Sequence, residues 1–236
     1  MKRVERKVRI GIIGAMAEEV VVLEKCLLEM KMWEEAGSHF YQGYIGEHEV
    51  IVVQSGIGKV MAGMVATLLV SHYHVDVLLN TGSAGGIGEG LSIGDVIVSD
   101  RLAYNDVDVT AFGYAKGQMA GMPLYYEADK EVVEKILKAA EKTGMTVKKG
   151  LITTADSFIA DQGKIAEIKS IFPDVLATEM EGAAIAQVAT QYQVPFAVIR
   201  AISDVADEEA SVSFDDFIIE AGKKSAEMVI RFVESC

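Results

Sequence analysis

Short apolar runs alternate with segments of helical periodicity along nearly the whole chain. Consecutive apolar positions occur in the runs VLLN (77–80), DVIVS (95–99) and FAVIRAIS (196–203), as expected of strands covered on both faces. We predict strands at Val8–Gly14, His39–Ile45, Val50–Gln54, Val75–Thr81, Asp95–Ala103, Thr146–Thr153, Val175–Ala177 and Pro195–Ile202. We predict helices at Ala17–Met30, Val60–His72, Lys130–Thr143, Gly163–Ile171, Glu181–Gln191 and Phe214–Val233. The pattern indicates an α/β fold with a sheet flanked by helices.

Two segments refine this picture. Tyr41–Ile45 and Val50–Gln54, joined by Gly46-Glu47-His48-Glu49, are typical of an antiparallel hairpin, so we expect a mixed sheet. Tyr104–Leu124 is rich in glycine and methionine without a clear period, which predicts a long loop that covers a substrate or contacts a second subunit. At 236 residues the chain fits one domain, 1–236, with the basic residues 1–7 as a peripheral extension.

Composition narrows the possible functions. Half of the residues are apolar, which suffices for a large core. A net charge of −13 disfavours nucleic-acid binding, which needs cations to neutralise phosphates, and argues against an anionic membrane surface. No 18-residue apolar stretch is present. Cys26 and Cys236 have no metal or disulfide spacing, and Cys26 lies on an apolar helical pattern, so we expect a buried free thiol and a cytoplasmic protein.

Several familiar motifs are absent or incomplete. Ser55-Gly56-Ile57-Gly58-Lys59 resembles a phosphate loop, but it lacks the first glycine of that motif and has Val60 where Ser or Thr would bind magnesium. His72 and His74 have no third ligand nearby, so we expect no metal site. Neither a dinucleotide fingerprint nor a G-x-S-x-G elbow occurs, which disfavours nucleotide cofactors and acyl transfer.

Polar residues recur just after the predicted strands. Because ligands of open α/β sheets gather at the carboxyl ends of strands, we expect these residues to share one rim. They are Met16 and Glu19, then Gly82-Ser83-Ala84-Gly85-Gly86, which we predict to be a loop with exposed backbone N–H groups, then Asp156, Phe158 and Ile159, then Glu179, Met180 and Glu181, and finally Arg200, Ser203 and Asp204. Taken singly, each has a structural explanation such as helix capping or turn formation. Their spacing alone names no reaction.

At these residues the chain closely resembles the 5′-methylthioadenosine/S-adenosylhomocysteine nucleosidases of the nucleoside phosphorylase superfamily. The likeness runs from Val8 to about Glu234. It rests on six blocks in order, namely Gly11–Met16, Gln54–Lys59, Asn80–Gly86, Asp108–Tyr114, Glu179–Glu181 and Arg200–Asp204. The resemblance implies a nucleoside phosphorylase-like fold, hydrolysis of the N-glycosidic bond of 5′-thioadenosine nucleosides, no cofactor and no metal.

The resemblance also implies catalytic roles. Glu19 would activate the attacking water, which Ser83 and Arg200 help to hold, and Asp204 would protonate the imidazole-ring nitrogen of the departing adenine. Two carboxyl groups suit this bond, because its cleavage develops positive charge on the sugar and negative charge on the leaving base. A general acid must keep its proton at neutral pH, which requires burial or a nearby carboxylate.

Substrate-binding roles follow from the same resemblance. Glu181 would bind the ribose hydroxyls and Met180 would pack under the sugar, while Phe158 would stack on adenine and the backbone of Ile159 would read its edge. The 5′ tail would lie among Met16, Ile57, Val109, Phe112 and Phe214. The partner subunit of a homodimer would supply Val109 and Phe112. Further contacts are expected at Ala84, Gly85, Glu179 and Ser203.

Three other functions are alternatives. A nucleoside phosphorylase would need cations for phosphate, whereas Glu19 occupies that face. A non-catalytic nucleoside-binding protein would not be expected to retain Glu19, Asp204, Glu181 and Arg200 together. An aminodeoxyfutalosine hydrolase would use the same adenine and ribose contacts. Departures from the family pattern, among them Asn105 and Ala120, leave the preferred 5′ group open.

Overall fold

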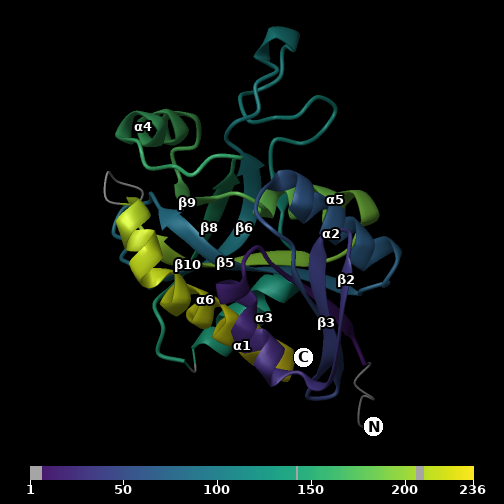
Figure 1. Ribbon diagram of the computed structural model, residues 1–236. Coiled ribbons are helices and arrows are strands. Elements are labelled where there is room, and N and C mark those ends of the chain that lie inside the picture. Colours follow the sequence, from purple (N-terminus) through teal and green to yellow (C-terminus); the bar gives the residue numbers. More distant parts are fainter. Residues whose placement is uncertain (1–6, 142, 206–209) are drawn as a thin grey trace.

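The predicted apolar strands lie in one ten-stranded sheet of the computed structural model, which describes residues 7–141, 143–205 and 210–236, without the side chains of 210–213 (Figure 1). The strands are β1 (Arg9–Gly14), β2 (Leu28–Glu35), β3 (Ser38–Ile45), β4 (His48–Gln54), β5 (Val77–Gly86), β6 (Val96–Tyr104), β7 (Tyr126–Glu127), β8 (Val147–Thr154), β9 (Val175–Glu179) and β10 (Phe196–Asp204). The helices are α1 (Ala17–Cys26), α2 (Lys59–Ser71), α3 (Lys130–Ala140), α4 (Gln162–Ile171), α5 (Gly182–Tyr192) and α6 (Ala210–Glu234), with a 3₁₀ turn, η1, at Thr110–Phe112. The predicted α/β class with a mixed sheet is confirmed. The predicted N-terminal extension lies outside the described residues except for Lys7.

Part of this sheet closes into a ring. Strand β5 pairs with β10, β10 with β6, β6 with β8, β8 with β9, and β9 returns to β5. The first half of β5 also pairs with β1, and from there β4, β3 and β2 form an open wing. Strand β5 serves both parts because it continues through Gly82-Ser83-Ala84-Gly85-Gly86, which we predicted as a loop. That prediction was wrong, since Gly85 and Gly86 pair with β9.

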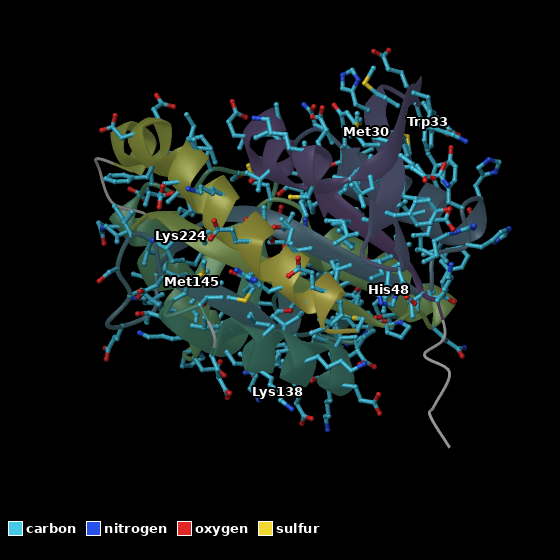
Figure 2. The ribbon with its side chains drawn as sticks, turned by 90° about the horizontal axis from the view of Figure 1, so that it is seen from below. Met30, Trp33, His48, Lys138, Met145 and Lys224 are labelled. Carbon is cyan, nitrogen blue, oxygen red and sulfur yellow. The ribbon has the colours of Figure 1, made fainter. Side chains whose placement is uncertain are left out.

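Helices cover the sheet in two groups. In the views of Figures 1 and 2, α1, α3 and α6 lie side by side, and α6 packs on β5 and β10. Helices α2 and α5 pack against each other on the other side (Figure 1). Gly222 of α6 allows close contact with α1, because a methyl group there would lie 2.5 Å from the carbonyl oxygen of Glu18. This contact fixes the first turn of α1, which carries Glu19.

The region after α1 differs from the prediction. The helix ends at Cys26, not Met30, and the chain continues as edge strand β2. Trp33 of β2 (labelled in Figure 2) stacks on Phe40 of β3, with ring centroids 5.4 Å apart. Tertiary packing therefore overrides the local helical pattern. Cys26 is a free thiol, but it is exposed, and our prediction that it is buried was wrong.

Two predicted connections are present with modified boundaries. Strands β3 and β4 form the antiparallel hairpin, and Ile45 pairs with His48, so the turn is only Gly46-Glu47. The stretch Tyr104–Leu124 is largely irregular and projects from the body of the molecule (Figure 1). Phe112 in this stretch is 81% exposed.

Among the described helices, none combines the length and the apolar character required to cross a bilayer.

Candidate functional site

A cavity of about 390 Å³ opens where the predicted rim residues meet. Its volume lies in the range of small-molecule sites. Its walls come from the last residues of β5, β9 and β10, from segments that follow β1, β4, β8 and β9 in the sequence, and from the start of α6. The lining residues are Ala15, Met16, Glu19, Ile57, Ser83, Ala84, Gly85, Phe158, Thr178, Glu179, Met180, Glu181, Ser203, Asp204, Phe214 and Asp215.

Glu19 is a buried carboxylate held by hydrogen bonds on both oxygens. Oε2 accepts from the backbone N–H groups of Ala15 (2.7 Å) and Met16 (3.2 Å). Oε1 accepts from the backbone N–H (3.0 Å) and hydroxyl (3.1 Å) of Ser83. These four donors fix the side chain at the first turn of α1, where the helix dipole also favours a negative charge. A fixed carboxylate facing a cavity is suited to accept a proton from a bound water.

Gly82 permits a close approach of opposite charges behind this carboxylate. A methyl group at residue 82 would lie 2.5 Å from Glu19 Oε1 and 2.3 Å from Arg200 Nη1. Real Cβ contacts are longer than 3.0 Å, so only glycine fits between the two side chains. The guanidinium of Arg200 therefore lies close behind the carboxylate that faces the cavity.

Arg200 lies on β10 and is almost completely buried, with 1% exposure. Its Nη2 donates to Asn80 Oδ1 (2.6 Å), to Glu181 Oε2 (3.3 Å) and to Glu179 Oε2. Burial acts to lower the pKa of Arg200, but the carboxylates of Glu179, Glu181 and Glu19 outweigh it and raise that pKa. Arg200 therefore stays charged and offsets part of the negative charge of the three glutamates.

Glu179 connects the guanidinium to the start of α5. Its Oε2 accepts from the backbone N–H groups of Glu181 (3.0 Å) and Gly182 (2.7 Å), which satisfies donors of the first helical turn. Its Oε1 accepts from the hydroxyl of Thr154, which in turn accepts from Ala183 N–H at 2.8 Å. Glu179 thus joins β8, β9, β10 and α5 at the cavity floor.

Glu181 faces the same cavity and is 4% exposed. Burial raises the pKa of its carboxyl group to about 7. Arg200 opposes this shift, Glu179 and Glu19 add to it, and the hydrogen bond from Gly58 N–H to Oε1 (2.9 Å) lowers the pKa again. The group therefore changes charge near neutral pH, at a point of the wall where it can accept hydrogen bonds from hydroxyl groups.

Asp204 lies at the end of β10 and is 1% exposed. The register of β10 against β5 shifts at this point, because Ile202 pairs with Ala84 and Asp204 pairs with the next residue, Gly85. Strand β10 therefore has one extra residue here, Ser203. Such a bulge redirects a side chain, and here the carboxyl group of Asp204 lines the cavity. The hydroxyl of Ser203 donates to Asp204 Oδ2 at 2.9 Å.

An aromatic pair forms the outer wall. The rings of Phe158 and Phe214 meet edge to face, with centroids 5.7 Å apart, and Phe158 is 48% exposed. Met16, Ile57 and Met180 add further apolar surface to the same cavity. The site therefore combines a flat apolar wall with carboxyl groups at its floor, and the residues described contain no group of side chains arranged for a metal ion.

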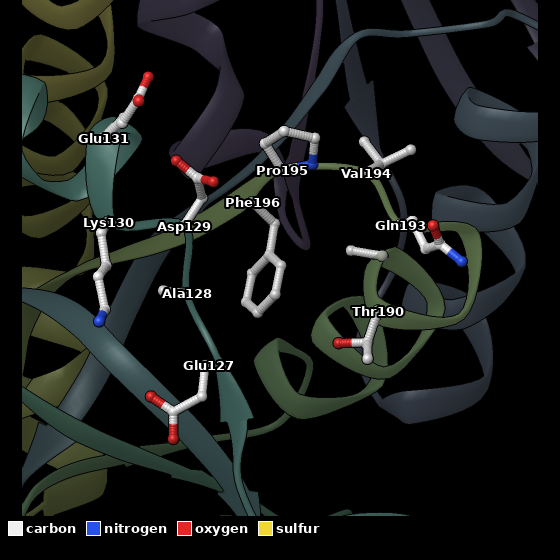
Figure 3. Close-up of a pocket in the computed structure, with 11 residues that line it drawn as sticks. Glu127, Ala128, Asp129, Lys130, Glu131, Thr190, Gln193, Val194, Pro195 and Phe196 are labelled. Carbon is white, nitrogen blue, oxygen red and sulfur yellow. The ribbon is translucent and has the colours of Figure 1, made fainter.

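A second hollow, of about 510 Å³, lies at the opposite end of β10. The ring of Phe196 points into it, and Asp129, Lys130 and Glu131 lie along its edge (Figure 3). It adjoins the amino end of β10, whereas α/β folds bind ligands at the carboxyl ends of their strands. It contains none of the rim residues.

Comparison with known proteins identifies the family of this chain. Residues 9–234 match the phosphorylase superfamily model. A 5′-methylthioadenosine/S-adenosylhomocysteine nucleosidase from Exiguobacterium is 50% identical over 94% of this chain and 96% of its own. The chain belongs to this nucleosidase family. A relative from Staphylococcus carnosus with the same name is 46% identical over 96% of this chain and 99% of its own.

Solved nucleosidase structures share the fold. S-adenosylhomocysteine nucleosidase from Streptococcus pyogenes, in complex with 5-methylthiotubericidin, superposes with a TM-score of 0.95 at 49% identity and covers 98% of both chains. The Streptococcus pneumoniae nucleosidase with the transition-state inhibitor MT-ImmA gives 0.93 at 51% identity, over 96% of this chain and 99% of that one. The expected family and its fold are thus confirmed.

Most of the residues expected to bind a nucleoside meet in the cavity. The exceptions are Arg200, Ile159, Val109 and Phe112. Arg200 lies behind the wall, and Ile159 is buried in a small apolar cluster beside α4, so a role for its backbone stays a prediction. Val109 and Phe112 belong to the projecting stretch that contains η1, away from the chain's own cavity.

Several residues of the site were not predicted. Ala15, Thr178 and Asp215 line the cavity and directly adjoin predicted residues in the sequence, so their position beside those residues is the signal that could have identified them. Gly58 and Thr154 hold the glutamates through contacts 123 and 25 positions apart. No local pattern signals such contacts, because they join segments that meet only in the folded sheet.

Proposed function

We propose that the protein hydrolyses the N-glycosidic bond of 5′-methylthioadenosine and S-adenosylhomocysteine and releases adenine and the 5′-thioribose product. The main support is that Glu19 and Asp204, from opposite ends of the sequence, line one cavity of nucleoside size. Family membership supports the substrate class, since relatives at about half identity carry these substrates in their names.

In the proposed reaction, Glu19 accepts a proton from a water molecule that attacks the anomeric carbon of the ribose. The bond to adenine breaks, its electron pair moves onto the base, and Asp204 donates a proton to the imidazole-ring nitrogen. The hydroxyl group of the water is then bonded to the anomeric carbon, and the proton from Asp204 is on adenine. No cofactor is needed. The hydrogen bonds from Ser83 and the backbone hold Glu19 in place, and such positioning contributes much of the rate of enzyme reactions.

The sugar is proposed to lie over the glutamate cluster. Glu181 accepts hydrogen bonds from the ribose hydroxyls, and Met180 packs beneath the ring. The carboxylates of Glu19, Glu179 and Glu181 surround one guanidinium, Arg200, so the floor has negative character when all are ionised. This charge stabilises an oxocarbenium-like sugar. Phe158 is proposed to stack on adenine.

The same charge balance favours water over phosphate as the nucleophile. None of the described residues that line the cavity is Lys or Arg. The nearest guanidinium, Arg200, already donates to Asn80, Glu179 and Glu181. Phosphate would meet uncompensated carboxylates, which disfavours a phosphorylase.

A homodimer is proposed to complete each cavity. Phe112, at the tip of a projecting segment, is 81% exposed, which is unusual for a phenylalanine unless a partner covers it. Phe112 and Val109 of one subunit would then contact the 5′ tail bound by the other. We also propose the cytoplasm as its location, because the two cysteines are free thiols.

The test is adenine release by purified protein from the two substrates in phosphate-free buffer, with and without added phosphate. Equal rates and free ribose product are expected. Absence of adenine would refute the proposed function. Phosphate-dependent formation of a ribose 1-phosphate would show that the reaction is phosphorolysis and not hydrolysis. Aminodeoxyfutalosine, assayed in parallel, tests the alternative 5′ group.

A further inference from the structure

The segment Ser55–Lys59 has a structural role that differs from the phosphate loop it resembles. Gly58 has a φ of +98°, which favours glycine, and stands at the start of α2. Its N–H donates to Glu181 Oε1 at 2.9 Å. The backbone donor that would contact phosphate in a phosphate loop thus binds a carboxylate of the candidate active site.

The start of α2 is capped by a residue distant in sequence. Gly58 has no side chain that could accept from the first turn, so the helix needs an outside acceptor. Asp156 supplies it, because its Oδ1 accepts from the backbone N–H of Lys59 at 2.8 Å, across 97 positions. The same oxygen would lie 3.1 Å from a methyl group at Gly58. Asp156 therefore contacts the turn that presents Gly58 N–H.

One cation holds Asp156 in place. Lys59 Nζ lies 2.7 Å from Asp106 Oδ2 and 3.6 Å from Asp156 Oδ2, and 5.4 Å from the ring centroid of Tyr104. Asp106 Oδ2 also accepts from the backbone N–H of Asp156 at 3.0 Å. The Lys59 side chain is only 23% exposed, so solvent screens these contacts incompletely. Without the ammonium group, two neighbouring carboxylates would repel each other.

We propose that Lys59, Asp106 and Asp156 are positioning residues that hold Gly58 N–H against Glu181. This inference rests on the proposed function, in which Glu181 binds the ribose hydroxyls. Loss of the lysine charge moves Asp156 away from the start of α2 and weakens the hydrogen bond to Glu181. Asp106 belongs to the root of Tyr104–Leu124, so the cluster also ties that projecting stretch to the sugar site.

A weaker hydrogen bond from Gly58 N–H should raise the pKa of Glu181. Burial already raises the pKa of Glu181 to about 7, with Arg200 opposing and Glu179 and Glu19 adding to the shift. Gly58 N–H lowers this pKa, so its loss raises the pKa further. A smaller fraction of Glu181 is then ionised at neutral pH, which weakens substrate binding while Glu19 keeps its contacts.

The experiment compares Lys59→Met with a matched control, Arg101→Met. Arg101 is 22% exposed, pairs with Asp100 and Asp174, and lies 5.1 Å from the ring centroid of Tyr125. It thus resembles Lys59 in burial and partners but contacts none of the residues that bind Glu181. Both variants are checked by circular dichroism and thermal unfolding before kcat and KM are measured against pH.

For Lys59→Met we expect KM to rise by about threefold to tenfold, as for a weakened hydrogen bond to a charged group, with kcat little changed. The acid limb of kcat/KM should move to higher pH by about half a unit. Lys59→Arg should restore the wild-type profile, and Asp106→Asn should shift it in the same direction, which provides a second test if Lys59→Met does not fold.

Two outcomes would overturn the inference. One is a Lys59→Met profile that superimposes on that of the wild type. The other is an equal shift in Arg101→Met, which would indicate a general loss of stability. If the wild-type protein itself releases no adenine, the proposed function fails instead. In that case the pKa of Glu181, followed by carboxyl NMR in Lys59→Met, still tests the link to Gly58.

Discussion

Gly82→Ala should separate catalysis from binding. A methyl group on residue 82 would lie 2.3 Å from Arg200 Nη1 and 2.5 Å from Glu19 Oε1, whereas ordinary contacts begin at 3.4 Å. One or both side chains must therefore move by about 1 Å, and a shift of that size in a catalytic group costs on the order of 100-fold in rate. We expect kcat for adenine release to fall by about this factor, with a much smaller change in KM, because Phe158 and Met180 keep their places and Gly58 N–H still holds Glu181.

The assay needs a folded variant and a matched glycine control. Overpacking costs about 1–3 kcal/mol, so Gly82→Ala should unfold at a lower temperature and remain native at assay temperature. Gly63→Ala on α2 is the control, because a methyl group there meets no atom within 4 Å and alanine is the better helix former. An unchanged kcat in folded Gly82→Ala would refute the view that Glu19 and Arg200 act from fixed positions against this backbone.

Further predictions follow from other contacts of the site. Burial raises the pKa of Glu181 to about 7, so folding takes up a proton between about pH 4.5 and 7. The contribution of this group to the free energy of unfolding is therefore present at acid pH and is lost as the pH rises to 7. In thermal unfolding across this window, the wild type should lose stability relative to Glu181→Gln as the pH rises, because glutamine does not titrate; a stability difference that is independent of pH would contradict this. Thr154→Val should lower stability by about 1–3 kcal/mol in denaturant unfolding, because Glu179 and Ala183 N–H lose a buried partner, whereas Thr154→Ser should retain it. Phe112→Ala should raise KM and leave the melting temperature unchanged if the partner subunit uses it, and an unaltered KM would argue against that contact.

Much of the site could be predicted because it follows from strand ends. Each buried strand is recognisable by consecutive apolar residues, and ligand groups gather where such strands end. Glu19, Ser83 and Asp204 were placed correctly on one rim for this reason. Their roles came from the resemblance to the nucleosidases, since spacing alone could not distinguish a helix cap from a proton carrier.

The errors occur where distant pairing decides the local structure. Strand β2 carries a helical pattern in its first residues, and only its pairing with β3 and the Trp33–Phe40 contact make it a strand. The glycines of β5 suggested a loop, yet Gly85 and Gly86 are held extended by β9. Sequence reasoning also could not anticipate that the buried Arg200 donates to Asn80 and two glutamates, because that network exists only inside the closed ring.

The most direct test of the central claim is adenine release by Asp204→Asn under saturating 5′-methylthioadenosine, with substrate binding measured by calorimetry on the same preparation. The account predicts a fall in turnover of about 10²–10⁴-fold, as for loss of a general acid, with binding still measurable. Near-wild-type turnover in this variant would contradict the assignment of Asp204 as the group that protonates the departing adenine.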